Sequence, residues 1–449
     1  MSNRKSQAHY YRFPTKGLFT DYSRLEATEL NALRAARAFL TVQGLTIARI
    51  VDLAGAWPMT PVNLLRETLP HWRRYSAVTQ QRFGDSPIGQ LKQCVRLALN
   101  DGPSPHGYYL AGIAEHENGP VLQRYVHDLL HETAIEFCRF AVERLHGSQP
   151  PLDDKQLLET LCRENGFPAV RTFLRLGREK IEGSDEDNRL AVAQSALFVK
   201  PATGMQGQDA MRWDKKVSGT YVNSAGQSCG SFDALLLRLR EQSSRLNRDL
   251  LVQTVATNRQ DIRAFAGRAL STVRLVTLRS AQGGLHPVQA GWRLASIGNA
   301  AVDNYHAGGT YFHVDYRTGE VGTGTSLGYP AHPQYLQSAP LTGKKLTGTT
   351  LPGWDAFRSL AVGLHAGMTR HTVCGWDLAL TDNGPVVVEC NSVPGMPAPR
   401  QRPLEGFLGT EYASRLTREI TGFLSELCPL GSRFRFKDNG PGEQSGPAS

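Results

Sequence analysis

The segment 374–391 carries the clearest set of oxygen ligands in the sequence. It has the pattern of strand, turn and strand, with an Asp-Asn-Gly turn signal at 382–384. Because side chains alternate faces along a strand, Glu389 and Asn391 point to one side, and Asp377 on the paired strand lies close to them if the hairpin forms. Two carboxylates and an amide oxygen at one spot suit Mg²⁺ (or Mn²⁺), which keeps positions for ligand phosphates. A plain hairpin with a polar face has the same pattern.

Two lysines stand where a phosphate group is expected to bind. Lys200 ends an apolar strand and is followed by a loop that contains Gly204 and Gly207. Glycines let backbone N–H groups approach a phosphate, and the lysine adds a positive charge. Lys155 opens a predicted helix over 155–164, where a cation opposes the helix dipole unless an anion also binds there. The Walker pattern is absent, and an ordinary turn and a solvated lysine are the alternative interpretations.

Other polar residues interrupt apolar strands. Arg274 and Arg293 lie among β-branched and apolar residues, so each lies on a solvated face or reaches into a site. The strand 250–255 contains Gln253 and leads toward a linker, and the segment 302–309 is a polar, glycine-rich loop.

The elements that position these residues follow from length and periodicity. A chain of 449 residues predicts about three structural units. Apolar spacing predicts one helix after the capping box at 23–26 and another from Gly119-Pro120 to Gly147, with short helices and loops over 45–118. From residue 196 onward, strands mix with helices, which predicts an α+β (α/β mixed) fold. A basic arm over 1–20 and a tail over 429–449 are expected to be flexible.

Charge and cysteine content limit the classes of partner. The net charge of +9 admits nucleic acid, an anionic surface or a small anionic ligand. Nucleic acid is disfavoured, because no aromatic-basic interleaving and no zinc knuckle occurs. Seven scattered cysteines without a CxxC pair indicate reduced thiols in a cytoplasmic protein. The apolar stretch 40–57 is too polar to cross a membrane, and the chain opens without a signal-peptide pattern.

A histidine pair offers a competing metal site. His127 and His131 are one helical turn apart, as in HExxH zinc sites, but Asp128 replaces the glutamate and the sequence contains no convincing third ligand. We interpret both histidines as solvated or capping residues on the polar edge of the helix.

Five motifs in one order resemble the ATP-grasp superfamily. They are LFVKPATG, STVRLVTL, VDNYHAGG, GTTLPGW and GWDLAL…GPVVVECNSVPG, within 150–427. The most similar branch is the sugar-transfer-associated ATP-grasp proteins, related to the α-L-glutamate-ligase-like group. This resemblance implies a two-lobed fold. A mainly helical N-terminal domain (21–150) would precede a central lid subdomain (151–252) and a C-terminal subdomain with the metal site (253–428).

The resemblance also implies a role for each candidate residue. The phosphate-binding set would be Lys155, Lys200 and the lid glycines Gly204 and Gly207. The adenosine-binding set would be Gln253 and Val255 at adenine and Asp261 at the ribose. The catalytic set would be Arg274, Arg293 and Asn304, facing the γ-phosphate and the transferred group, and the metal set would be Asp377, Glu389 and Asn391. Two features depart from the family, since the lid is bulkier than usual and Gln253 replaces a common glutamate.

The implied activity is an ATP- and Mg²⁺-dependent carboxylate–amine ligase that forms an acyl phosphate. Its substrates would be small-molecule or peptide acids and amines, and its product a tailored sugar, polysaccharide or peptide. A small-molecule kinase and a non-catalytic nucleotide-binding module stay open as alternatives with the same fold.

Overall fold

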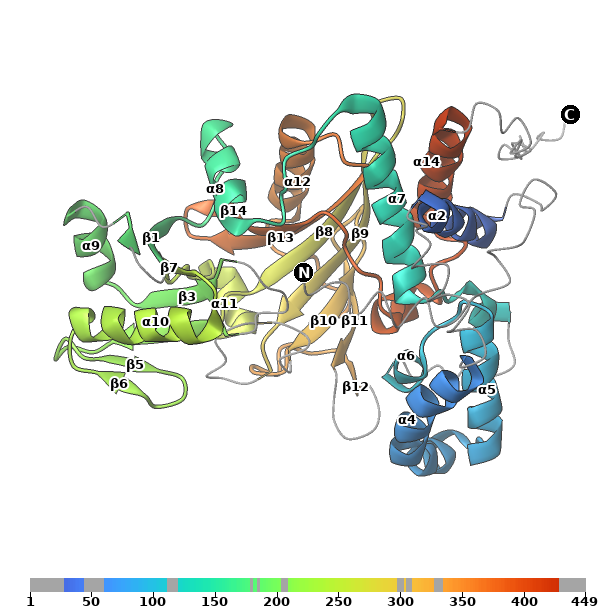
Figure 1. Cartoon of the computed structure of the whole chain (residues 1–449). Helices are drawn as coiled ribbons and strands as arrows, with labels where there is room; N and C mark the ends of the chain where they lie inside the picture. Colours follow the sequence, from blue (N-terminus) through green and yellow to red (C-terminus); the bar gives the residue numbers. More distant parts are fainter. Residues whose placement is uncertain are drawn as a thin grey trace, which may run out of the picture.

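The computed structural model describes residues 28–43, 60–110, 120–177, 181–183, 186–202, 209–296, 303, 309–326 and 334–427. The expected flexible arm and tail lie outside the described residues, as do Gly204, Gly207 and Asn304. Two seven-stranded antiparallel sheets dominate the described part, and the predicted α+β fold is confirmed (Figure 1).

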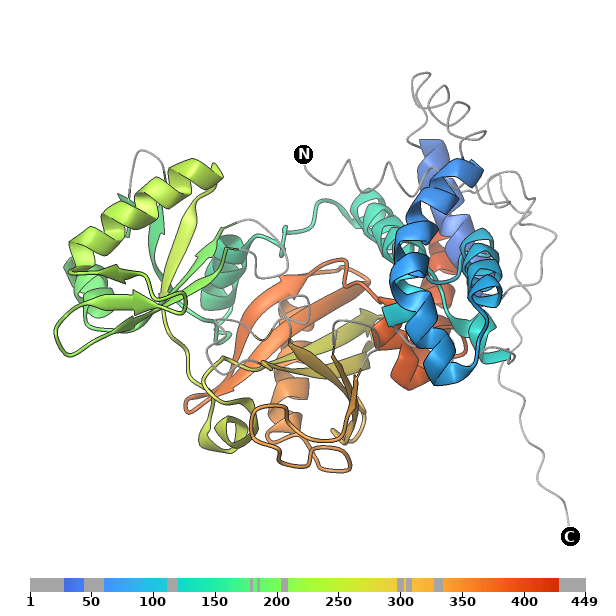
Figure 2. The same cartoon turned by 90° about the horizontal axis from the view of Figure 1, so that it is seen from below.

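The first sheet forms a separate lobe, drawn in green in Figure 2. Its strands, in spatial order, are β2 (Ile181–Glu182), β1 (Thr172–Leu176), β7 (Leu250–Thr254), β3 (Leu197–Pro201), β4 (Met211–Lys215), β5 (Tyr221–Asn223) and β6 (Ser228–Cys229). Helices α9 (Glu186–Ala193) and α10 (Phe232–Leu246) contact this sheet. The predicted boundary between residues 252 and 253 falls inside β7.

The second sheet carries most of the candidate residues. Its strands, in spatial order, are β12 (Gln334–Leu336), β11 (Val321–Ser326), β10 (Thr310–Val314), β9 (Leu285–Leu294), β8 (Thr272–Arg279), β13 (Val373–Thr381) and β14 (Gly384–Asn391). Strands β13 and β14 form the predicted hairpin, in which Asp377 lies opposite Glu389 and Gly375 opposite Asn391.

The two faces of the second sheet are covered differently. Apolar side chains such as Leu275, Trp292 and Trp376 pack in one core with α8 (Lys155–Glu164) and α12 (Trp354–Met368). On the opposite face, Val276, Leu278, Val288 and Val373 are covered by α2 (Glu29–Gln43), α7 (Asp128–His146) and α14 (Glu411–Leu427). The candidate residues on β8, β9 and β13 share this second face, beside the part that these helices cover.

The N-terminal region is helical, and α2 (Glu29–Gln43) is the helix predicted after the capping box at 23–26. Short helices occur within 45–118 as expected, but one helix there, α4 (Thr60–Phe83), has 24 residues. It packs with α5 (Pro87–Leu99), α6 (Pro105–Leu110) and the 3₁₀ helix η4 (Pro120–Arg124) around a small core. The helix expected from Gly119-Pro120 begins instead at Asp128, because η4 and a short extended segment precede it; it ends at Gly147 as predicted. Helix α11 (Gln260–Ala266) follows β7, and α13 (Ala398–Gln401) follows the hairpin.

The two histidines of α7 have different environments. The Nδ1 atom of His127 accepts the N–H of Leu129 at 3.1 Å, so its predicted capping role is confirmed. His131 is fully buried against Phe407 and Tyr412, and its Nε2 lies 3.1 Å from the Tyr412 hydroxyl. Its expected place on the polar edge is therefore wrong, because that side of α7 packs on α14. Among the described residues, no group of three His, Cys, Asp or Glu side chains is arranged to hold a metal.

Burial of His131 predicts an acid-sensitive fold. Burial lowers the pKa of His131 to about 3, so the unfolded chain binds a proton below about pH 6.5 that the native chain does not. Stability from this residue is complete above about pH 6.5 and is lost as pH falls toward 3, with about 1 kcal/mol gone at pH 5.5. His131→Gln should show a flatter pH dependence in urea denaturation between pH 7 and 5. The exposed His146, changed to Gln, is the control, and equal slopes for both variants would contradict the prediction.

The six described cysteines are buried free thiols. None of the described helices is long and apolar enough to cross a membrane.

Candidate functional site

A cleft of about 580 Å³, its open mouth included, lies between the two sheets. The first sheet supplies Lys200 and Gln253, and β8 of the second supplies Thr272. The full lining is Val170, Phe198, Lys200, Arg212, Gln253, Thr254, Val255, Ala256, Leu270, Thr272, Asp303 and Val388. Apolar walls with a few polar groups suit a flat aromatic ring with a charged extension.

The predicted adenosine-binding residues divide into two groups. Gln253 and Val255 line the cleft. The Gln253 side chain donates to the Thr172 hydroxyl at 3.0 Å, and the Val255 N–H donates to the Ala196 carbonyl at 3.0 Å. Asp261 instead lies on α11, is partly exposed, and is not among the residues that line the cleft.

The two predicted phosphate lysines lie within electrostatic reach of each other. Lys200 is buried, and desolvation together with the charge of Lys155 lowers its pKa to about 8, against the opposing charges of Glu389 and Glu159. Asp154 caps the helix that begins at Lys155, since its Oδ1 accepts two N–H groups at 2.9 Å. This corner of the cleft therefore combines two cations with the carboxylate of the hairpin.

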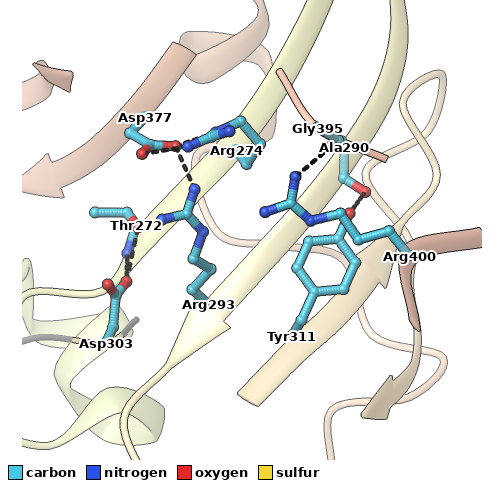
Figure 3. Close-up of polar contacts among 9 residues, drawn as sticks. All are labelled: Thr272, Arg274, Ala290, Arg293, Asp303, Tyr311, Asp377, Gly395 and Arg400. Carbon is cyan, nitrogen blue, oxygen red and sulfur yellow. Dashed lines mark hydrogen bonds and ion pairs between the residues drawn. The ribbon is translucent and has the colours of Figure 1, made fainter. Parts of the chain in front are cut away.

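Arg274 and Arg293, the arginine pair, share one buried carboxylate (Figure 3). Arg274 donates to Asp377 through Nε and Nη2, the latter at 2.8 Å, and Arg293 Nη2 lies 2.6 Å from Asp377 Oδ1. Burial alone raises the pKa of Asp377, but the charges and hydrogen bonds of the arginine pair hold it at about 2. The strand register explains the geometry, because Arg274 lies opposite Asp377 on β13.

A glycine on β9 makes room beside the arginine pair. Gly291 lies opposite Arg274, and a Cβ atom there would come 2.0 Å from the ring of Tyr311. Any side chain at position 291 would therefore displace the tyrosine ring from this face of the sheet.

The hairpin residues fit a divalent cation. Both oxygens of Asp377 accept hydrogen bonds from the arginine pair, whereas no hydrogen bond to the side chain of Glu389 occurs within the described part of the chain. The amide nitrogen of Asn391 is buried and has no partner among the described residues. A carboxylate and an amide oxygen beside a phosphate-binding cleft match the few protein ligands that Mg²⁺ takes.

Two site residues were not selected from the sequence. Asp303 lines the cleft, and its Oδ2 accepts the backbone N–H of Thr272 at 2.6 Å and the hydroxyl at 2.7 Å. Burial raises the pKa of Asp303 to about 6, although Arg293 and Thr272 favour its ionised form. Its signal was its place next to Asn304 in the glycine-rich loop. Arg400, on the short helix α13 after the hairpin, also lies near this cluster and had no sequence signal (Figure 3).

These features define a class of protein in which two antiparallel sheets enclose a cleft. One sheet places a lysine, Lys200, at this cleft, and the other places arginines and carboxylates beside it. The family model for sugar-transfer associated ATP-grasp matches residues 138–402, which is more than half of the chain. The chain belongs to the sugar-transfer-associated ATP-grasp family, as the motifs predicted.

The comparison with solved structures finds ligases at low sequence identity and low TM-score. D-alanyl-alanine synthetase A from Vibrio cholerae is 14% identical over 61% of this chain and 65% of that one, with a TM-score of 0.36. D-alanine–D-alanine ligase from Bacillus anthracis, complexed with ATP, is 12% identical over 61% and 65%, with a TM-score of 0.33. L-amino acid ligase from Bacillus licheniformis is 16% identical over 64% and 54%, with a TM-score of 0.35. The chain thus spans about two thirds or less of these proteins, and no curated protein matches it.

Proposed function

We propose that this protein is an ATP-dependent carboxylate–amine ligase that works through an acyl phosphate. The observation that carries this proposal is the arginine pair bound to the buried Asp377. Arg274 lies two residues after Thr272 on β8, and Thr272 lines the cleft together with Lys200. Buried cations beside a cleft of nucleotide size can stabilise the negative charge of a phosphoryl group during its transfer.

The charges of the site explain how such a reaction would proceed. ATP and a carboxylate repel each other, and Lys155, Lys200 and the arginine pair offset that repulsion. A carboxylate oxygen attacks the γ-phosphorus, the bond to ADP breaks, and an acyl phosphate forms. The amine then attacks the carbonyl carbon, loses a proton, and expels inorganic phosphate to give an amide.

The metal would assist the phosphates rather than the acyl group. Mg²⁺, when bound, supplies charge neutralisation for the polyphosphate. Glu389 and Asn391 would hold it, with Asp377 adding charge at the same face of the hairpin. Asp303 would be held at the cleft by its bonds to Thr272.

A screen for product release tests the proposed function. The full chain is incubated with ATP, Mg²⁺ and pairs drawn from amino acids, short peptides, sugar acids and amines. A ligase releases ADP and inorganic phosphate in equal amounts, and only when both an acid and an amine are present. ADP without phosphate, together with a phosphorylated acceptor, would indicate a kinase instead.

Lys200 makes nucleotide affinity depend on pH. Because its pKa is lowered to about 8, its positive charge is largely lost by pH 9, and ATP should bind about tenfold more weakly there than at pH 7. Lys200→Arg should remove most of this dependence, because arginine stays charged. The exposed Lys216→Arg serves as the control. Fluorescence titrations with a labelled ATP analogue measure the affinity, and the same pH dependence in both variants would contradict the prediction.

A further inference from the structure

One arginine of the cluster has no part in the proposed phosphoryl transfer. Arg400 is partly exposed, and its Nη1 donates to the carbonyl oxygen of Gly395 at 2.8 Å. Its guanidinium carbon lies 5.4 Å from the centre of the Tyr311 ring. Desolvation, together with the nearby arginine pair, lowers the pKa of Arg400 to about 10, so the residue holds its charge at a cost.

Arg400 has no paired carboxylate among the described residues. Asp377 already bridges the arginine pair, and no carboxylate within the described ranges comes within ion-pair distance of Arg400. From α7, Asp128 and Glu132 face Arg400 at longer range. Burial raises the pKa of both carboxyls, for Glu132 to about 8, so Glu132 is largely uncharged at neutral pH. Arg400 therefore lies near two other arginines without a paired carboxylate of its own among the described residues.

Hydrogen bonds of Met396 and Gln401 hold the segment around Arg400 in place. Asp128 Oδ1 accepts the N–H of Met396 at 2.8 Å. Gln401 accepts the N–H of Val126 at 3.0 Å and donates to the carbonyl oxygens of Val126 and Met396 at 2.8 and 2.7 Å. These contacts keep Arg400 beside other cations, where a purely structural arginine would be placed next to a carboxylate.

The location of Arg400 separates it from the nucleotide. Figure 3 shows Thr272 and Asp303 on one side of the arginine pair and Arg400 with Tyr311 on the other. Because Thr272 and Asp303 line the cleft, Arg400 lies on the side away from it, toward α7. A group that attacks the acyl phosphate from the side opposite ADP would enter here.

We propose that the acceptor substrate carries an anionic group, a carboxylate or a phosphate monoester, and that Arg400 binds this group. This inference rests on the proposed function and names the class of its second substrate. An anion would offset the repulsion among the three arginines, and a guanidinium matches the paired oxygens of either group. An amino acid and a phosphorylated amino sugar are the two sources of such an acceptor.

Titration with minimal anions tests Arg400 directly. Acetate and methyl phosphate are titrated into the full chain by calorimetry, with Mg²⁺ and a non-hydrolysable ATP analogue and again without them. We expect at least one probe to saturate, with affinity about tenfold or more weaker in Arg400→Gln and mostly kept in Arg400→Lys. The stronger probe identifies the anion. Equal affinity in wild type and Arg400→Gln, or no saturable binding to wild type, would overturn the proposal.

Two controls separate binding from damage to the fold. Arg358→Gln removes a charge from the exposed side of α12 and should leave anion affinity unchanged. Arg400→Gln removes a desolvated charge and can still donate to Gly395, so its thermal midpoint should equal or exceed that of wild type. A fall of more than a few degrees would instead indicate that Arg400 has a structural role.

Turnover distinguishes this proposal from the proposed function. Hydroxylamine is an acceptor without an anionic group, so the loss of kcat/KM in Arg400→Gln should be at least about tenfold larger for an anionic amine than for hydroxylamine. Equal losses would place Arg400 on the transferred phosphoryl group and overturn the proposal. No hydroxamate with wild type would count against the ligase, and the anion titrations would still decide the role of Arg400.

Discussion

Replacing Glu389 with Gln and Asn391 with Ala together should lower ADP release about a thousandfold while the chain stays folded. Both side chains lie on one face of β14, and neither makes a hydrogen bond to the described residues. The substitutions therefore remove the negative charge at position 389 and the amide oxygen at position 391, beside the phosphate lysines, and leave the packing of the hairpin unchanged. ADP release with saturating ATP and Mg²⁺ measures the effect.

The control for this double variant lies in the same hairpin. Asp382→Asn also removes one carboxylate, but Asp382 is exposed in the turn and pairs only with the exposed Arg263. It should keep near-normal turnover. Near-normal ADP release in the Glu389/Asn391 variant itself would remove the hairpin from the site.

Asp377→Asn should destabilise the fold by about 3–5 kcal/mol. The substitution keeps the size of the side chain but leaves two buried guanidinium groups without their shared negative charge. Denaturant titration at pH 7 measures the loss. Glu389→Gln, which removes a carboxylate from the opposite position on β14, is the matched control and should change stability by less than about 0.5 kcal/mol.

The stabilisation that Asp377 provides depends on pH only in the acidic range. The native pKa of Asp377 is about 2, below the value of about 3.9 for an unfolded aspartate. Its stabilisation is thus complete above about pH 4 and is lost as pH falls toward 2. The stability difference between wild type and Asp377→Asn should stay constant between pH 5 and 8. A difference that shrinks within that range, or a loss below about 1 kcal/mol at pH 7, would contradict the buried bridge.

The hairpin and its neighbours could be predicted because their signals are local. An Asp-Asn-Gly turn sets the register, and alternation along the strand puts Glu389 and Asn391 on one face. Lys200 was likewise found from the end of an apolar strand. These features depend only on residues within a few positions of one another.

Arg400 and Asp303 could not be found in this way. Arg400 reaches the site because contacts with Val126 and with Asp128 of α7, about 270 residues earlier in the chain, fix α13 and the segment before it. Asp303 becomes distinctive only when its loop meets the first residue of β8. The start of α7 was misplaced for a similar reason, since the apolar residues of η4 continue the helical spacing but pack in a different core.

Helix α7 brings the N-terminal region next to the segment that carries Arg400. Helices α2, α7 and α14 cover one end of the sheet face that carries the arginine pair, and Asp128 and Glu132 lie beside Gly395 at the edge of that cover. If Arg400 binds the acceptor as proposed, the N-terminal region would border that binding site.

The most direct test of acyl phosphate formation uses hydroxylamine in place of the amine. The full chain, ATP and Mg²⁺ are incubated with a panel of carboxylic acids and excess hydroxylamine, and hydroxamates are measured by mass spectrometry. A carboxylate–amine ligase should form one hydroxamate for each ADP released, and the Glu389/Asn391 variant should form none above background. ADP release accompanied by a phosphorylated acceptor and no hydroxamate would contradict the account.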